Sequence, residues 1–259
     1  MNDVNPASQT IDLNSDVGEG FGRWSIADDN QIMPLISSAN IACGFHAGDP
    51  VVMIATCSSA HRHGVRIGAH IGYRDLPGFG RRFIDYDPQD LRAETIYQIG
   101  AITAAAHSIG AEVTYVKPHG ALYNRMAHDE DHAAAVIEGI QATNPSLALM
   151  VLSGTPVVDQ ALEAGLHVIR EAFADRVYTP DGTLKSRKYP DAVHHDPELA
   201  ADQALQLALG QPVLSSAGTP VSIDADSICV HGDNEAALAV VRQIHQLFQH
   251  HGIEVAHAH

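Results

Sequence analysis

The sequence predicts an α/β fold built on a parallel sheet, and three observations support this prediction. Short runs of β-branched residues alternate with longer Ala-rich segments along the whole chain, which is typical of β-α units. Each apolar run is compact and has the length of a buried strand. The 259 residues are enough for such a sheet to close into a barrel within one domain.

The expected elements alternate in order along the chain. Strands are expected over residues 11–14, 40–43, 65–69, 113–117, 148–152, 167–170 and 227–230. Helices are expected over residues 28–37, 50–63, 88–108, 129–142, 156–164, 196–209 and 234–250. Several of these helices open with Pro or Asp, which suit a first turn. No linker divides the chain, so we expect a single β/α-barrel domain over 1–259, with peripheral termini at 1–9 and 252–259.

Composition limits the class of protein. Hydrophobic residues make up 45% and charged residues 18% of the chain, as in a water-soluble globular protein. The net charge of -16 repels phosphate backbones and anionic lipids, so we expect neither nucleic acid nor a membrane as partner. The first ten residues lack a signal-peptide pattern and no apolar run could span a membrane, which predicts a cytoplasmic protein.

Titratable side chains follow six of the expected strands. In parallel α/β folds, functional groups gather at the carboxyl ends of strands. One histidine there is often scaffolding, but four placed alike indicate an active site. The residues at these strand ends are Asn14, Asp16, Glu19, His46, Asp49, His70, Lys117, His119, Glu171, Asp175, His231 and Asp233.

Other motifs carry less information. The glycine-rich turns 18–23 and 78–82 place flexible backbone beside arginines, which suits a carboxylate or a phosphate. Neither turn is a G-x-G-x-x-G fingerprint, and no P-loop occurs. No nucleophile motif is present, so general acid/base or metal-assisted hydrolysis fits better. The irregular connection over 171–196 is open to two interpretations, a lid over the site or a surface excursion.

Six motifs resemble the LamB/YcsF family, the group of 5-oxoprolinase A subunits, and they occur in the family's order. They are IDLNSDVGEGFG (11–22), ANIACGFHAGDP (39–50), GAHIGYRDLPGFGRR (68–82), VKPHGALYN (116–124), EAFADRVY (171–178) and ICVHGDN (228–234). The resemblance implies a β/α barrel-like fold of the glycoside hydrolase/deacetylase type. It also implies ATP-dependent opening of 5-oxoproline to L-glutamate, together with partner subunits B and C.

The resemblance and the strand-end positions together define a hypothetical site. Asp16 and Glu171 are expected to act as base and orienting carboxylate, while His46, His70, His119 and His231 stabilise charge and move protons. Lys117 and Arg82 are candidates for the substrate carboxylate or a phosphate. The expected substrate contacts are Asp12, Asn14, Asn40, Arg82, Lys117, Tyr123 and Asp175.

The cofactors and partners stay open in part. ATP is expected as a co-substrate, handled by this chain or by the partner subunits. Deacetylase barrels hold a metal with one Asp and two His, and Asp16, His70 and His119 match that donor set if a divalent metal is present. Two alternatives remain: a stand-alone metal-dependent amide or acetyl hydrolase, and a non-catalytic regulator that binds a small ligand. A homo-oligomer is compatible with either.

Overall fold

Seven parallel strands close into a barrel in the computed structural model, which describes residues 9–232 and 234–258. The strands are β1 (Gln9–Val17), β2 (Ser38–Ala42), β3 (Arg66–Ile71), β4 (Val113–Pro118), β5 (Ala148–Leu152), β6 (Val168–Phe173) and β9 (Ser227–Cys229). Neighbours pair in this order, and β9 pairs with both β6 and β1, which closes the ring. The prediction of a barrel of about seven parallel strands is confirmed.

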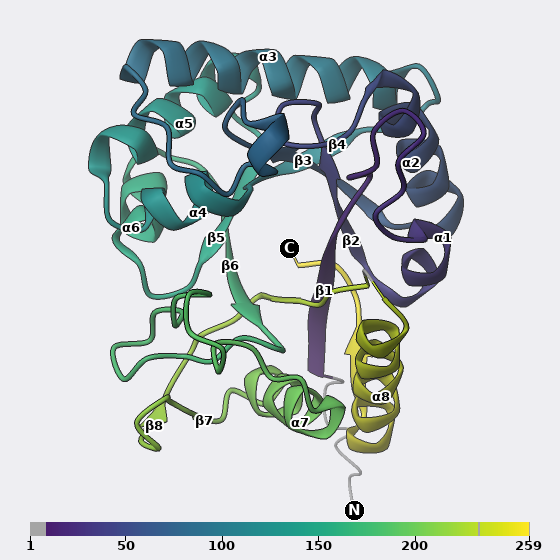
Figure 1. The fold of residues 1–259 in the computed structure, drawn as a ribbon, viewed down its shortest axis with the longest axis vertical. Coiled ribbons are helices and arrows are strands. Elements are labelled where there is room, and N and C mark those ends of the chain that lie inside the picture. Colours follow the sequence, from purple (N-terminus) through teal and green to yellow (C-terminus); the bar gives the residue numbers. More distant parts are fainter. Residues whose placement is uncertain (1–8, 233, 259) are drawn as a thin grey trace, which may run out of the picture.

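Helices cover the outside of the barrel (Figure 1). They are α1 (Asp29–Ile32), α2 (Pro50–His63), α3 (Pro88–His107), α4 (Gly120–Met126), α5 (Glu130–Thr143), α6 (Pro156–Glu163), α7 (Pro197–Ala208) and α8 (Glu235–His251). α3 packs against α5, and α7 packs against α8. The expected Pro and Asp starts are present: at α2, the Asp49 carboxylate accepts hydrogen bonds from the backbone N–H groups of Val51 and Val52. No helix in the described part of the chain is long and apolar enough to cross a membrane.

Several elements differ from the prediction. The helix expected over 28–37 is shorter: α1 passes into the 3-10 turn η1 (Met33–Leu35), and Ile36 is already extended. Pro34 explains this because it cannot donate the hydrogen bond of a helix interior. α4 was not predicted, since its seven residues have no side-chain cap. A second 3-10 turn, η2 (Leu76–Gly78), and a hairpin of β7 (Val213–Leu214) and β8 (Pro220–Val221) were also not predicted.

The C-terminal segment extends the sheet. Ile253–Val255 form β10, which pairs in parallel with residues 9–11 of β1. Ile253 is buried, so part of the segment predicted as a peripheral terminus is tied to the barrel. Residues 1–8, the rest of the predicted N-terminal periphery, lie outside the described residues.

The barrel interior combines a polar network with two small apolar clusters, while the main apolar core lies between the strands and the helices. Along β1, Leu13 and Val17 belong to this outer core. The alternate residues hydrogen-bond across the interior: the Asn14 side chain donates to Ser227, and the Asn40 side chain donates to Asn14 and Asp16. Successive side chains of a strand point to opposite faces, so β1 carries core residues and site residues in alternation.

Candidate active site

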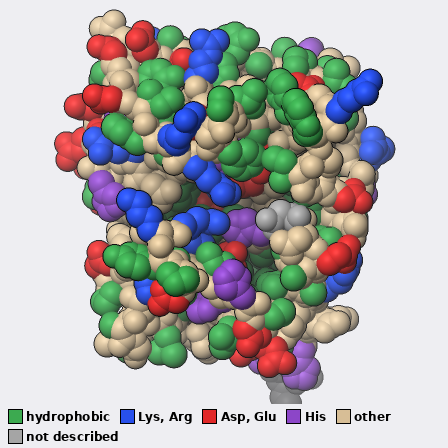
Figure 2. Space-filling model, in the orientation of Figure 1, with side chains coloured by type: hydrophobic (Ala, Val, Ile, Leu, Met, Phe, Trp, Pro, Cys, Tyr) green, Lys and Arg blue, Asp and Glu red, His purple; other side chains and the backbone are tan. Residues whose placement is uncertain are grey.

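A cavity of about 790 Å³ opens at the carboxyl ends of the strands. This volume lies in the usual range for small-molecule sites. Its lining comes from the loops after β1, β3, β4, β6 and β9. Figure 2 shows the hollow in the middle of the face, with Lys and Arg side chains gathered beside it and histidine at its edge. The barrel edge predicted to hold the site therefore carries a cavity.

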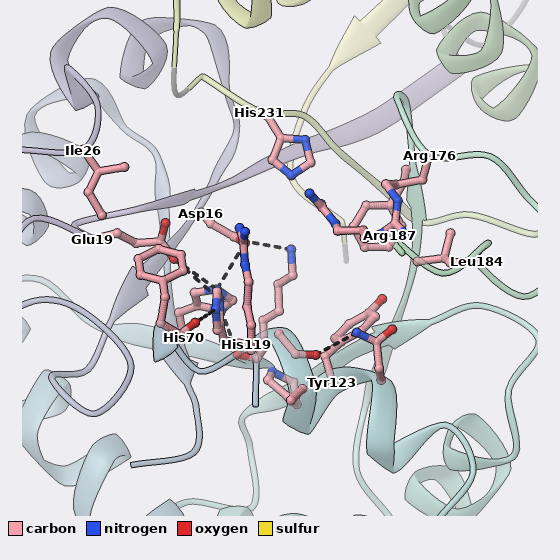
Figure 3. Close-up of a pocket in the computed structure, with 18 of the residues that line it drawn as sticks. Asp16, Glu19, Ile26, His70, His119, Tyr123, Arg176, Leu184, Arg187 and His231 are labelled. Carbon is pink, nitrogen blue, oxygen red and sulfur yellow. Dashed lines mark hydrogen bonds and ion pairs between the residues drawn. The ribbon is translucent and has the colours of Figure 1, made fainter. Parts of the chain in front are cut away.

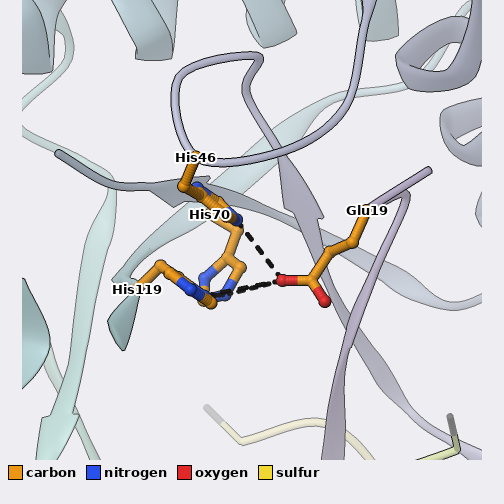
Figure 4. A group of neighbouring side chains, drawn as sticks. All are labelled: Glu19, His46, His70 and His119. Carbon is orange, nitrogen blue, oxygen red and sulfur yellow. Dashed lines mark hydrogen bonds and ion pairs between the residues drawn. The ribbon is translucent and has the colours of Figure 1, made fainter. Parts of the chain in front are cut away.

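Glu19 and three histidines form a compact cluster at this cavity (Figure 4). Glu19 follows β1, His46 lies in the loop before α2, His70 lies near the end of β3, and His119 precedes α4. One donor atom from each lies within 4.8 Å of the others. Glu19 Oε1 is 3.3 Å from His46 Nε2, 4.0 Å from His70 Nε2 and 3.5 Å from His119 Nδ1. The rings of His46 and His119 stack at 3.9 Å.

Backbone carbonyls determine which ring nitrogens carry protons. A carbonyl only accepts hydrogen bonds, so His70 Nδ1 donates to the Lys117 carbonyl at 3.0 Å, and His119 Nε2 donates to the Phe79 carbonyl at 2.9 Å. In neutral rings, His70 Nε2 and His119 Nδ1 are then both lone-pair acceptors. These two nitrogens lie 2.9 Å apart. A cation, either a proton on one ring or a metal ion, is needed between them.

The cluster also contains buried nitrogen and oxygen atoms that make no hydrogen bond. Both ring nitrogens of His46 and Oε1 of Glu19 have no hydrogen bond to the described residues. Burial, together with His70, lowers the pKa of His46 well below its usual range. Burial, together with His46 and His70, does the same for the pKa of His119. Neutral, convergent imidazoles beside a carboxylate, with backbone carbonyls on the outer nitrogens, are the usual donor arrangement of a metal site.

A buried lysine links two carboxylates beside this cluster. Lys117 Nζ lies 3.0 Å from Asp16 Oδ1 and 2.6 Å from Glu171 Oε1. Burial alone lowers the pKa of Lys117, but Asp16 and Glu171 outweigh it and hold the pKa well above the usual value. Burial raises the pKa of Asp16, but His70 and Lys117 outweigh it and hold the pKa well below the usual range. Asp16 also lies 3.2 Å from His70 Nε2 and lines the cavity.

A second ion pair lies at the cavity after β6 and β9. His231 Nδ1 is 2.8 Å from Asp175 Oδ2. Asp175 raises the pKa of His231 against the opposing effect of burial. His231 lines the cavity (Figure 3), and so does Tyr123 of α4. Asp233, also expected at this strand end, lies outside the described residues.

Five predicted substrate contacts do not line the cavity. One of them is Asp175, although its ion-pair partner His231 does line the cavity. Asp12, Asn14 and Asn40 are buried inside the barrel beneath it. Asp12 accepts hydrogen bonds from Ser37, Ser38 and Ser227, which makes it part of the scaffold. Arg82 turns away and pairs with Asp75, whereas its neighbour Arg81 lines the cavity. The sequence does not indicate which of these two adjacent arginines points into the cavity.

The candidate metal-binding cluster differs from the donor set that the resemblance implied. Of Asp16, His70 and His119, only the two histidines belong to the cluster, and Glu19 and His46 complete it. Asp16 instead bridges His70 and Lys117. Glu19 follows the first strand in sequence, but it was not assigned a role because its position in a glycine-rich loop does not show where the carboxylate points.

The connection after β6 forms one side of the cavity. Arg176 and residues 184–188 line it. Figure 3 shows Arg176, Leu184 and Arg187 across the cavity from Glu19, His70 and His119. This segment is therefore part of the site wall.

Comparison with known proteins identifies the relatives of this chain. The LamB/YcsF family model matches residues 11–259. The chain is 59% identical to the 5-oxoprolinase A subunit of Corynebacterium efficiens over 255 residues, which cover 98% of this chain and 100% of that protein. It is 48% identical to the 5-oxoprolinase A subunit of Streptomyces griseus, over 95% of this chain and 98% of that protein.

Solved structures share the fold. The lactam utilization protein from Thermus thermophilus superposes with a TM-score of 0.91 at 40% identity, covering 95% of this chain and 99% of that one. The catalytic domain of a peptidoglycan N-acetylglucosamine deacetylase from Eubacterium rectale has a TM-score of 0.50 at 11% identity, over 99% of this chain and 91% of that one, and shares the fold alone. The family match over nearly the whole chain and the identity to these relatives show that this chain belongs to the LamB/YcsF family.

Proposed function

We propose that this chain is the A subunit of an ATP-dependent 5-oxoprolinase and opens the lactam of 5-oxoproline to L-glutamate. Relatives that are named as 5-oxoprolinase A subunits match nearly the whole chain. The observation that carries the proposal is the convergence of Asp16, Lys117, His231 and the Glu19–histidine cluster on one cavity. A lactam is a stabilised amide, so its opening needs a base for water, charge stabilisation at the carbonyl oxygen, and a proton for the leaving nitrogen.

Two carboxylates and one lysine act in the attack of water on the lactam carbonyl. Asp16 lines the cavity and its pKa is held low, so it is ionised and accepts a proton from the attacking water. Glu171 is fully buried and does not line the cavity, so it acts by positioning Lys117 at 2.6 Å. Lys117 delivers positive charge beside the carbonyl oxygen as that oxygen becomes negative.

His231 is the proton donor to the ring nitrogen. Asp175 raises the pKa of His231, which favours the protonated ring that can give up a proton at the cavity. Asp16 and His231 thus hold opposite protonation states in one site, which is the usual division between base and acid.

The Glu19–histidine cluster fits a divalent metal ion. Glu19, His46, His70 and His119 would hold it, because one donor atom from each lies within 4.8 Å of the others. The facing atoms of Glu19 and His46 make no hydrogen bond, and the outer nitrogens of His70 and His119 are bonded to carbonyls. When bound, such an ion polarises a carbonyl oxygen and lowers the pKa of water.

The remaining parts of the proposal concern substrate, nucleotide and partners. Arg81, which lines the cavity, takes the role predicted for Arg82 and binds the substrate carboxylate. ATP supplies the driving force. Subunits B and C complete the complex, since the relatives carry the name of one component of a multisubunit enzyme. The cytoplasmic location stays a prediction.

Glutamate release from 5-oxoproline, with and without ATP, tests this function in the complex with subunits B and C. We expect Asp16→Ala and His119→Ala to reduce the rate at least ~100-fold, as is typical when a general base or an electrostatic group is removed. His107→Ala is the matched control, because His107 is exposed at the end of α3. Unchanged rates in both site variants would exclude this site.

Metal binding is tested separately on the purified chain. We expect about one divalent ion per chain, lost with His46→Ala, and Co²⁺ absorption bands that require His70 and His119. Full turnover after complete chelation would exclude the metal.

A stand-alone metal-dependent amide or acetyl hydrolase is the second candidate. The Glu19–histidine cluster favours it, because a bound metal ion activates water without a nucleotide. Turnover of an amide without partner subunits would support it. The ligand-binding regulator predicts instead tight binding of 5-oxoproline without turnover in the complete complex.

A further inference from the structure

Positive charge is concentrated at the cavity. Among the described residues, seven Lys and Arg side chains line it, against three Asp and Glu side chains. The chain as a whole has a net charge of -16. The seven cations are Arg81, Lys117, Arg125, Arg176, Lys185, Arg187 and Lys188. A local concentration opposite in sign to the whole molecule focuses anions on the cavity.

Three of these cations are already neutralised. Lys117 lies between Asp16 and Glu171. Arg125 is 2.5 Å from Asp129, and Lys185 is 2.6 Å from Asp191. The other four, Arg81, Arg176, Arg187 and Lys188, have no ion pair with a carboxylate of the described residues.

Three of the unpaired cations come from the connection after β6, and we call Arg176, Arg187 and Lys188 the wall cations. Arg176 is 6% exposed, and its guanidinium donates a 2.7 Å hydrogen bond to the Lys185 carbonyl. Burial and the neighbouring Arg187 lower the pKa of Arg176. Asp175 offsets this effect only in part, since the pKa of Arg176 stays below its usual value. A further anion would stabilise the buried guanidinium beside its neighbour, and Figure 3 shows both arginines at the cavity.

The proposed substrate does not supply enough negative charge for this wall. 5-Oxoproline carries one carboxylate, which Arg81 can bind. A phosphoryl group carries a charge of about -2 and three acceptor oxygens, and it suits clusters of arginine. The chain has no P-loop or dinucleotide fingerprint, so cationic side chains would have to provide the recognition.

We propose that the wall cations form a subsite that binds a phosphoryl group. This proposal rests on the proposed function and extends it, since it places a phosphoryl subsite on this chain opposite the Glu19–histidine cluster. The group has two sources, the terminal phosphate of ATP and a phosphoryl group already on a small substrate.

Calorimetric titration of the purified full chain with inorganic phosphate tests the subsite. We expect saturable binding that weakens with salt. Arg187→Gln and Lys188→Gln should each weaken it about 10-fold to 100-fold, which corresponds to the loss of a charge-assisted hydrogen bond. Arg242→Gln is the matched control, because Arg242 is exposed on α8 and the substitution removes the same charge. All three side chains are exposed, so the variants should fold.

Competition identifies the source of the group. If a non-hydrolysable ATP analogue displaces phosphate and carbamoyl phosphate does not, the subsite belongs to the nucleotide. If carbamoyl phosphate displaces it and the ATP analogue does not, the subsite belongs to a phosphorylated substrate. Either result supports the subsite. Displacement by 5-oxoproline itself would mean that the wall binds the substrate carboxylate, and the proposal would be wrong.

The proposal is also wrong if phosphate does not bind, or if Arg187→Gln and Arg242→Gln weaken binding equally. These outcomes are independent of the proposed function. ATP-dependent glutamate release that depends on His119, with no phosphate bound to this chain, would remove the subsite and leave the function. Phosphate binding without glutamate release in the complex would leave the subsite and remove the proposed function.

Discussion

Gly80 supports the Glu19–histidine cluster from behind, and its replacement by alanine tests that packing. Its backbone has a φ of +62°, and an added Cβ would lie 2.7 Å from the Cβ of His46 and 2.8 Å from Cδ2 of His119. Gly110 is the matched control, because its φ is +77° and nothing lies within 4 Å of an added Cβ. The two substitutions therefore share the backbone cost and differ in the contact with the histidines.

The expected magnitudes follow from these two terms. An alanine in the left-handed region costs about 1–2 kcal/mol, which is the whole expected effect of Gly110→Ala. Overpacking adds about 1–3 kcal/mol, so Gly80→Ala should lower the free energy of unfolding by about 2–5 kcal/mol. Because His46 and His119 must move to make room, Gly80→Ala should also weaken metal binding and glutamate release, while Gly110→Ala should not.

Urea denaturation followed by circular dichroism gives the free energies of unfolding, and Co²⁺ titration reports on the cluster. Equal losses of stability in the two variants, with Co²⁺ affinity unchanged in Gly80→Ala, would refute the packing argument. A small loss of stability with a large loss of Co²⁺ affinity would still agree with it, because displaced histidines relieve the overlap.

Two further predictions concern the buried ion pairs. Lys117→Met removes the ion-pair partner of the fully buried Glu171 carboxyl group, so urea denaturation should show a loss of about 3–5 kcal/mol. Adding Glu171→Gln should restore part of this loss, and no recovery would contradict the pairing. The second prediction concerns His231, whose pKa in the folded chain is raised by Asp175. The ion pair therefore stabilises the fold fully below the unfolded pKa of about 6.5. This stabilisation is lost as the pH rises through the folded pKa. The stability difference between wild type and Asp175→Asn should therefore close at high pH, and NMR titration of His231 in that variant should show a lower pKa; an unchanged value would refute the assignment.

The barrel, and the edge of the barrel that carries the site, could be predicted from local sequence patterns. Strand length, apolar runs and helix caps are local properties, so α2 begins and ends at the predicted residues, Pro50 and His63. His46, His70, His119 and His231 could be placed at strand ends for the same reason, since the carboxyl ends of parallel strands share one edge.

Local patterns do not indicate which side chains meet at that edge, and this became clear from the folded chain. Glu19 joins the histidines, Arg81 rather than Arg82 lines the cavity, and Asn40 lies beneath it. These outcomes depend on side-chain rotamers and on the paths of loops, which are set by contacts far apart in the chain. Arg176 and Arg187 reach the cavity through a connection without regular structure, whose course no local pattern encodes. Periodicity specifies which residues a strand delivers to an edge, whereas the packing of the closed barrel determines where their charged ends point.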